Sequence, residues 1–307
     1  MGKKALSWAI DFHVHPLPLL PDQLIVDEVE ASGVEKCVLL AVDVDYKMLD
    51  EPRISQHVAS TLFEAGSWGL YELEHAKVLL QLARTPNERV AKLVEEHPDI
   101  FVGIGSVNPA KGMEYVMRGL EEIRALGLVG VKLLPTLQLF EPWERREELK
   151  AIFDFCSKHG LLLVLHTGCD PGPWELPALS DCARPEHYRP FIEAYPEVPV
   201  VLAHAGSYSI RRPGIWLDEA LDLVSSNDNV WLDIAAVTYL AVEEKFARKI
   251  RDRVGFDRVL FGSDWPTVFK TTVSEALGRL MTSKPLTEQE KEAVARENAR
   301  ELLKAVL

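Results

Sequence analysis

The chain has 307 residues, of which 47% are hydrophobic and 26% are charged, and its formal net charge at pH 7 is −13. This composition is typical of one globular domain, residues 1–307, with a sizeable core, and the acidic balance argues against binding to the phosphate backbones of nucleic acids. The sequence has no run of about 18 or more apolar residues that could span a membrane, so we expect neither nucleic acid nor a membrane as a partner.

The cysteines and the N-terminal residues indicate a reducing compartment. Cys37, Cys156, Cys169 and Cys182 form no CxxC pair and are too few for a disulfide scaffold. The start, MGKKALSWAIDFHVH, contains no apolar segment long enough for a secretion signal. We therefore expect a cytoplasmic protein.

Short apolar segments alternate with longer amphipathic ones along the chain. Near-continuous apolar runs such as LLLVL and VPVVL are typical of parallel strands buried on both faces. They predict strands at 8–13, 36–42, 100–107, 129–134, 161–166, 198–204, 230–235 and 258–262. The amphipathic segments predict helices at 21–32, 71–96, 112–126, 142–159, 185–195, 215–226, 241–254, 273–281 and 287–305.

Eight strand–helix units in succession predict a closed parallel (β/α)8 TIM barrel rather than an open doubly wound sheet. Segment 43–70 is long for a strand-to-helix connection and carries Pro52, Gly66 and Gly69. We expect it to form an insertion after strand 2, a loop or short helix over the mouth of the barrel, because long connections in compact domains tend to be functional. The last helix follows the barrel as a C-terminal addition.

Metal-binding residue types follow the predicted strands. In such barrels functional groups lie at the carboxyl ends of the strands. His13 and His15 end the first strand, His166 the fifth and His204 the sixth, and Asp264 follows the eighth. Because side chains alternate along a strand, His13 and His15 point the same way and can share one cation. His166 and Asp264 can complete a shell that suits zinc, with iron, manganese, cobalt or nickel as alternatives.

Four segments at these strand ends are recognisable. IDFHVH, LVLHTG, VVLAHAGS and LFGSDWP resemble, in this order, motifs of the amidohydrolase superfamily, and most closely its amidohydrolase 2 branch. The resemblance covers about 10–266, and the closing ENARELL is similar to the terminal helix of that branch. It implies that His13, His15, His166 and Asp264 surround a divalent metal, with His204 nearby as a ligand or catalytic group.

Lys132 lies in GVKLLP at the end of the fourth strand. This segment is similar to one in which some superfamily members carry a lysine that is carbamylated by carbon dioxide and bridges two metals. The alternatives are an unmodified lysine that pairs with a carboxylate of the protein or binds one of the substrate. One ion is favoured because the amidohydrolase 2 branch often works with a single metal, and two are expected if Lys132 is carbamylated.

The expected function is a hydrolase that uses a metal-activated water on a small lactone, amide or ester that bears a carboxylate. Asp264 would orient the water and move its proton, and His204 or the metal would stabilise the developing negative oxygen. Lys132 is counted with the catalytic residues. The alternative is a nonhydrolytic decarboxylase or hydratase of the same superfamily.

Residues that can contact a substrate lie in the loops after strands 5 and 6. Arg184, Arg211 and Arg212 can clamp a carboxylate, and Tyr208 can line the pocket. Other polar residues that follow strand ends are Asp43, Asp45, Asn108, Gln138 and Asp170.

Two further hypotheses are less favoured. A TatD-like deoxyribonuclease also starts with an HxH strand, but that family is expected to show ETD at strand 8, where this chain has GSD. A barrel that has lost its chemistry would lack a metal residue, and none is missing here. A homo-oligomer is possible by analogy with other barrels of this kind.

Overall fold

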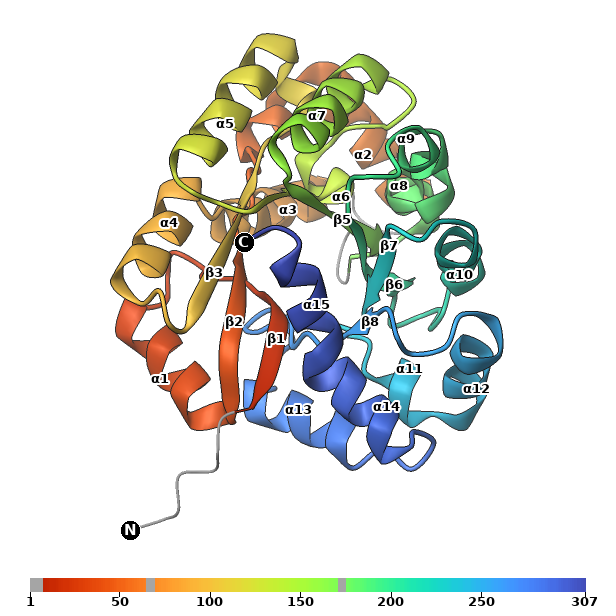
Figure 1. Ribbon diagram of the computed structural model, residues 1–307. Coiled ribbons are helices and arrows are strands. Elements are labelled where there is room, and N and C mark those ends of the chain that lie inside the picture. Colours follow the sequence, from red (N-terminus) through yellow and green to blue (C-terminus); the bar gives the residue numbers. More distant parts are fainter. Residues whose placement is uncertain (1–7, 65–69, 171–174) are drawn as a thin grey trace.

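The computed structural model describes residues 8–64, 70–170 and 175–307. Its parallel strands follow one another around a single sheet in the order of the sequence (Figure 1). They are β1 (Ala9–Val14), β2 (Val34–Leu40), β3 (Phe101–Ser106), β4 (Gly130–Leu133), β5 (Leu162–Gly168), β6 (Val200–Tyr208), β7 (Val230–Asp233) and β8 (Val259–Leu260). All eight predicted strands are therefore present, although β8 is shorter than the predicted segment 258–262.

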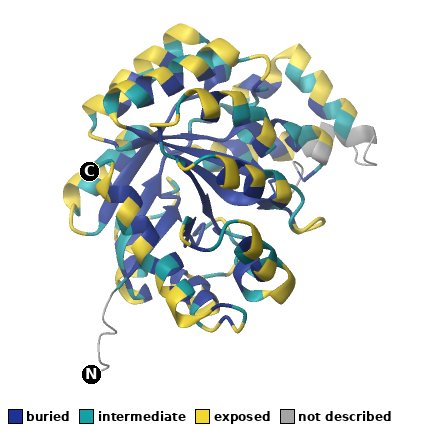
Figure 2. Cartoon of the chain, turned by 45° about the vertical axis from the view of Figure 1, so that its right-hand side comes forward, coloured by how far each residue is buried: buried dark blue, intermediate teal, exposed yellow. Residues whose placement is uncertain are grey.

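The sheet closes between its first and last strands. The backbone N–H of Phe12 donates to the carbonyl of Phe261 at 2.9 Å, and Val14 forms a parallel bridge with Trp265. Helices surround the strands, and their exposed residues lie on the outer faces while the strands are buried (Figure 2). The predicted TIM barrel is confirmed.

The helices around the barrel bury their apolar faces against the strands. They are α1 (Asp22–Ser32), α4 (Asn87–Glu96), α5 (Met113–Ala125), α7 (Arg146–His159), α9 (Arg189–Ala194), α10 (Leu217–Ser226), α12 (Glu244–Arg253) and α13 (Val273–Met281). Shorter turns stand between them: η2 (Pro109–Lys111), α6 (Pro135–Gln138), α8 (Pro177–Ser180), η3 (Asp181–Ala183), η4 (Pro185–Tyr188) and α11 (Tyr239–Val242). Predicted segment 241–254 is thus divided between α11 and α12.

The C-terminal segment consists of α14 (Glu288–Glu292), a π-helical turn (Ala293–Glu297) and α15 (Asn298–Lys304). Ala299, Leu302 and Leu303 pack with side chains from the barrel interior, such as Phe12 and Val38. The terminal helix therefore contributes to the inner core and leaves the opposite end, where the carboxyl ends of the strands meet, for the functional groups.

The expected insertion after β2 contains a short 3₁₀ helix, η1 (Tyr46–Asp50), and α2 (Pro52–Glu64), and α3 (Leu70–Ala83) follows. Gly66 and Gly69 lie outside the described residues. The single helix predicted at 71–96 is wrong, because the chain ends α3 at Ala83 and starts α4 at Asn87. Between them Thr85 pairs with Val42 in an antiparallel bridge, and Pro86 lacks the N–H that a continuous helix needs.

Two further observations bear on the expected environment of the protein. None of the helices in the described part of the chain is long and apolar enough to cross a bilayer. The four cysteines are buried and unpaired.

Candidate metal centre and its cavity

The end of β1 presents two imidazoles to one point, as the alternation of strand side chains predicts. His13 Nε2 lies 3.2 Å from His15 Nε2, and Asp264 Oδ1 lies 3.6 Å and 3.4 Å from the same two nitrogens. Val14, the residue between them, packs instead into the apolar cluster that contains α1 residues. These three metal-capable atoms come together although their residues span almost the whole sequence.

His166 and His204 complete the ring of histidines. The ring centroid of His204 lies 4.9 Å from that of His13 and 4.7 Å from that of His166. Nδ1 of His204 donates a hydrogen bond to the carbonyl of Ala235 at 2.8 Å, so Nε2 of the same ring takes no part in this hydrogen bond. His166 Nε2 is buried and has no hydrogen-bond partner. The structure thus brings together all five residues at which the sequence predicts a metal centre.

The backbone is constrained at two of these positions. His204 has φ of 62° and Asp264 has φ of 59°, a left-handed conformation that residues other than glycine rarely adopt. Such conformations cost free energy and are concentrated at functional sites. His204 lies within β6 and Asp264 lies in the loop after β8, and both side chains border the barrel mouth.

The protonation of these groups fits a cation. His13 donates from Nδ1 to Asp233 Oδ2 at 2.8 Å, and burial, followed by the charge of Lys132, lowers the pKa of His13 to about 3. Nε2 of His13 therefore carries no proton, and its lone pair faces His15 Nε2 and Oδ1 of Asp264. A cation placed between these atoms would contact both nitrogens and the carboxylate oxygen, and imidazole nitrogens with a carboxylate are ligands that zinc and similar ions prefer.

Asp233, at the end of β7, is a site residue that sequence reasoning missed. Its Oδ2 accepts from His13, and its Oδ1 accepts from the backbone N–H of His204 at 2.8 Å and of Ala235 at 3.1 Å. Burial opposes its ionisation, but the charge and hydrogen bond of His13 outweigh burial and lower the pKa of Asp233 to about 2. The available signal was an aspartate inside the apolar strand VWLD, because a fully buried aspartate almost always has a partner.

Asp11, two residues before His13, was also missed. Its Oδ1 accepts from the backbone N–H of His13 at 3.1 Å and of Ser263 at 2.9 Å, which ties β1 to the loop that carries Asp264. Burial raises the pKa of Asp11 to about 7. Its role in the structure is to hold the segments that carry His13 and Asp264 side by side.

Lys132 lies beside this centre and points into the cavity. It is fully buried, and its Nζ has no hydrogen-bond partner. Burial lowers its pKa to about 8, against the opposing charges of Asp233, Asp264 and Asp170. Asp170 Oδ2 lies 3.3 Å from His166 Nε2, and burial raises the pKa of Asp170 to about 7.

A cavity of about 250 Å³ opens onto the centre. Its lining residues are His15, Leu17, Val42, Leu79, Ala83, Lys132, Leu134, Leu137, His166, Asp170, His204, Tyr208, Asp264 and Thr267. Tyr208 therefore lies where the sequence places it. Arg211 and Arg212 do not line this cavity. Both are exposed and line a smaller cavity of about 160 Å³ with Cys169 and Glu175.

The remaining polar residues after strand ends have structural partners. Arg184 is paired with Glu219. Asp45 caps η1, Asn108 accepts from the N–H of Ala110, and Gln138 joins Leu134 to the carbonyl of Val107. Of the polar residues suggested for the pocket, Asp170 and Tyr208 thus reach it.

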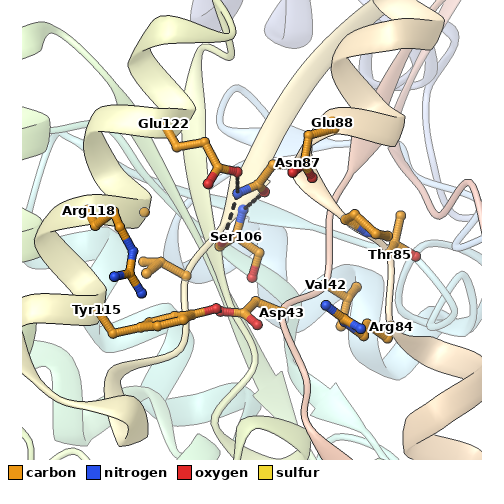
Figure 3. A pocket seen from close by; sticks show the side chains of 13 residues that line it. Val42, Asp43, Arg84, Thr85, Asn87, Glu88, Ser106, Tyr115, Arg118 and Glu122 are labelled. Atoms are coloured by element: carbon orange, nitrogen blue, oxygen red, sulfur yellow. Dashed lines mark hydrogen bonds between the residues drawn. The ribbon is translucent and has the colours of Figure 1, made fainter.

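Asp43 lines a separate polar cavity of about 190 Å³ (Figure 3). Its carboxylate points toward Tyr115 and accepts from the Tyr115 hydroxyl at 2.8 Å and from Lys111 Nζ at 3.1 Å. Arg84 and Arg118 also line this cavity. Val42 separates it from the histidine cavity, since Val42 lines both.

Comparison with known families agrees with this geometry. The model of an amidohydrolase family matches residues 10–305, nearly the whole chain. The chain belongs to the amidohydrolase 2 family. Members of this family are enzymes that act on small molecules. Family membership and the cluster of histidine and aspartate side chains together support the binding of a divalent metal.

Individual relatives are distant. The 2-amino-3-carboxymuconate-6-semialdehyde decarboxylase of Dictyostelium discoideum is 24% identical over 259 residues, which cover 73% of this chain and 67% of that protein. An uncharacterised TIM-barrel protein of Bordetella bronchiseptica has a TM-score of 0.70 at 19% identity and covers 97% of this chain and 99% of its own. The 5-carboxyvanillate decarboxylase of Novosphingobium aromaticivorans, complexed with manganese and 4-hydroxy-3-methoxy-5-nitrobenzoic acid, has a TM-score of 0.60 at 18% identity and covers 93% and 81%. At such identities the structural likeness shows the fold alone.

Proposed function

We propose that this chain is a metal-dependent decarboxylase that removes carbon dioxide from a small organic acid. The observation that carries the proposal is Lys132, a fully buried lysine whose amine has no hydrogen-bond partner and borders the cavity. A buried ammonium group without a partner is costly, and a carboxylate of the substrate would satisfy it. The decarboxylase activity of the Dictyostelium relative supports the same reaction.

The metal would be held by His13, His15, His166 and Asp264. We propose one zinc ion, with manganese as the alternative that the Novosphingobium decarboxylase suggests. When bound, the ion would supply positive charge that polarises the oxygens of the substrate. Residues of the chain would orient the ligands and bind the substrate. Asp233 orients His13, and Lys132 would bind and orient the carboxylate that leaves.

The reaction also needs a proton. The bond between the carboxylate carbon and the rest of the acid breaks, its electron pair stays on the remaining carbon, and that carbon takes a proton while carbon dioxide departs. We assign delivery of this proton to Asp264, which is ionised at rest and would first take a proton from water, leaving hydroxide that the solvent neutralises, with His204 beside it to stabilise negative charge on the substrate. Of the substrate-binding residues expected from the sequence, we retain Tyr208, because Arg211 and Arg212 line a different cavity.

Hydrolysis remains the second candidate, and one observation favours it. Burial opposes ionisation of Asp264, but its contact with His15 and the charges of His13 and His204 outweigh burial, and the pKa of Asp264 lies well below its ordinary range. An ionised carboxylate is ready to take a proton from water, as hydrolysis of a lactone, amide or ester requires.

Isotope labelling separates the two reactions. Zinc-loaded protein is incubated with panels of aromatic or unsaturated carboxylic acids and of lactones in deuterated water and, separately, in ¹⁸O-labelled water. Decarboxylation releases carbon dioxide and leaves deuterium on the carbon that carried the carboxylate. Hydrolysis places ¹⁸O in the product acid without loss of carbon dioxide, and that result alone would overturn the proposal. In both cases Asp264→Asn should abolish turnover.

A further inference from the structure

The cavity beside the metal centre has one polar end and one apolar wall. The polar side chains belong mainly to the ends of β4, β5, β6 and β8 and include Lys132, His166 and His204. The apolar side chains lie after β1, after β2, on α3 and after β4: Leu17, Val42, Leu79, Ala83, Leu134 and Leu137. The two kinds of side chain therefore occupy different sectors of the barrel mouth.

The insertion supports the apolar wall from behind. Val42 and Leu134 belong to one buried apolar cluster that also contains Leu49, Val58, Leu73, Ala76 and Leu80 from η1, α2 and α3. Ala83 and Leu137 pack against the same cluster. Because packed interiors resist rearrangement, this wall offers a substrate a fixed apolar surface. The insertion after β2 thus supports the cavity wall rather than forming a separate peripheral loop.

Cationic groups on the cavity surface are scarce. Among the residues that the structure describes, Lys132 is the one lysine or arginine that lines it. Segments 65–69 and 171–174 contain neither lysine nor arginine. The cavity therefore offers a substrate positive charge at its polar end, from Lys132 and from the metal proposed above, and none along the described part of the α3 wall.

Resting on the proposed function, we infer that the substrate carries a single carboxylate and that its remaining part is an uncharged ring or unsaturated chain held against Leu79 and Ala83 of α3. A second carboxylate directed at this wall would lose its hydration without gaining a partner. The size agrees, because an apolar cavity of about 150 Å³ holds benzene and this one, at about 250 Å³, has room for a ring with a carboxylate.

Equilibrium binding tests the inference without turnover. Benzoate and isophthalate have the same ring, and isophthalate adds a second carboxylate. Isothermal titration of the zinc-loaded protein should give a dissociation constant for isophthalate at least about tenfold higher than that for benzoate. Equal or tighter binding of isophthalate would overturn the inference, and this measurement needs no variant to fold.

A positive charge placed on the wall should remove the preference for benzoate. Leu79→Arg adds a partner for the second carboxylate and should lower the isophthalate-to-benzoate ratio of dissociation constants by about tenfold or more. Val78→Arg is the matched control, because Val78 is the neighbouring residue on α3, is 52% exposed and does not line the cavity. A ratio that is the same in folded Leu79→Arg and in the parent would also overturn the inference.

The outcome is independent of the reaction type. If the enzyme proves to be a hydrolase, the binding ratio still reports on the wall. If it releases carbon dioxide efficiently from a dicarboxylate whose second charge lies against α3, the proposed function stands and this inference is overturned.

Discussion

Asp233 accepts a hydrogen bond of 2.8 Å from Nδ1 of His13, and both side chains are fully buried. This contact connects the end of β7 to the end of β1 and fixes which nitrogen of His13 carries the proton. Nε2 is left as a lone pair toward His15 and Asp264. A carboxylate behind a metal-binding histidine both orients the ring and makes it a better ligand.

Replacing Asp233 should therefore weaken metal binding without unfolding the chain. Asp233→Asn keeps an oxygen that can accept from the N–H of His204, but it removes the negative charge beside His13. We expect zinc affinity to fall by about 10- to 100-fold, measured by competition with a chromophoric chelator. Asp222→Asn, at a side chain that is 53% exposed, is the control. Unchanged affinity in Asp233→Asn would refute the orienting role.

Metal removal should destabilise the protein through the same cluster. At free zinc 100 times its dissociation constant, binding adds about 2.7 kcal/mol to the free energy of unfolding, so the melting temperature should rise when the chelated protein is reloaded. His166→Ala should abolish most of this rise, since the buried Nε2 of His166 is lost as a ligand. His187→Ala should retain it, because His187 lies on the surface beside Asp181 and Trp143. A full zinc response in His166→Ala would remove His166 from the metal site.

The strands and the histidine cluster could be predicted from local patterns. Continuous apolar runs identify buried parallel strands, and the barrel rule then places His166 and His204 at one rim. Alternation predicts that His13 and His15 share a direction and that Val14 does not, as observed. These features depend on periods of two residues and on strand ends, which the sequence displays directly.

Features that depend on distant pairing could not be predicted. The break between α3 and α4 arises where Thr85 pairs with Val42, which lies more than 40 residues earlier in the chain. Pro86 is the one local signal of this break, because proline disfavours a continuous helix. Arg211 follows β6 as expected, but its backbone N–H is bonded to Glu175 and its side chain lies at another cavity. Loop paths of this kind are set by tertiary contacts and not by residue type.

Lys132 should bind substrate without binding metal. We expect one zinc ion per chain in the parent and also in Lys132→Met, measured by mass spectrometry of the metal content. For a carboxylic acid substrate, KM should rise by about tenfold to a hundredfold, because a hydrogen bond to a charged group is lost. Lys291→Met, at a lysine that is 6% exposed on α14, should leave KM unchanged. Two ions in the parent and one in Lys132→Met would instead indicate a carbamylated lysine.

Acid should weaken the attachment of the C-terminal segment to α12. Glu290 accepts two hydrogen bonds from Arg251, at 2.7 Å and 2.8 Å, and these with the capping of Thr287 lower its pKa from 4.5 to about 2. A depressed carboxyl pKa stabilises the fold above pH 4.5, and this contribution is lost as pH falls toward 2. Glu290→Gln should therefore cost about 1 kcal/mol at pH 7.

The pH dependence supplies the control for this prediction. Denaturant titrations of parent and Glu290→Gln between pH 7 and pH 3 should show a difference in unfolding free energy that is constant down to about pH 5 and narrows as pH falls below 4.5. Glu288→Gln, at a side chain that is 85% exposed, should show little difference at any pH. If the difference in unfolding free energy between parent and Glu290→Gln stays constant from pH 7 to pH 3, the ionised form of Glu290 is not what stabilises the helix.

The approach of β5 to β6 depends on Gly168. Its φ is 117°, and a Cβ at this position would lie 2.4 Å from the backbone nitrogen of Tyr208. Gly168→Ala should therefore separate the strand ends that carry His166 and Tyr208 and cost more than about 2 kcal/mol of stability. Gly127→Ala, also at positive φ but with open space around its Cβ, should cost only about 1 kcal/mol. Because Tyr208 lines the cavity, Gly168→Ala should also weaken benzoate binding, whereas Gly127→Ala should not; equal effects of the two substitutions would show that backbone strain alone, and not the contact with Tyr208, determines the requirement for glycine.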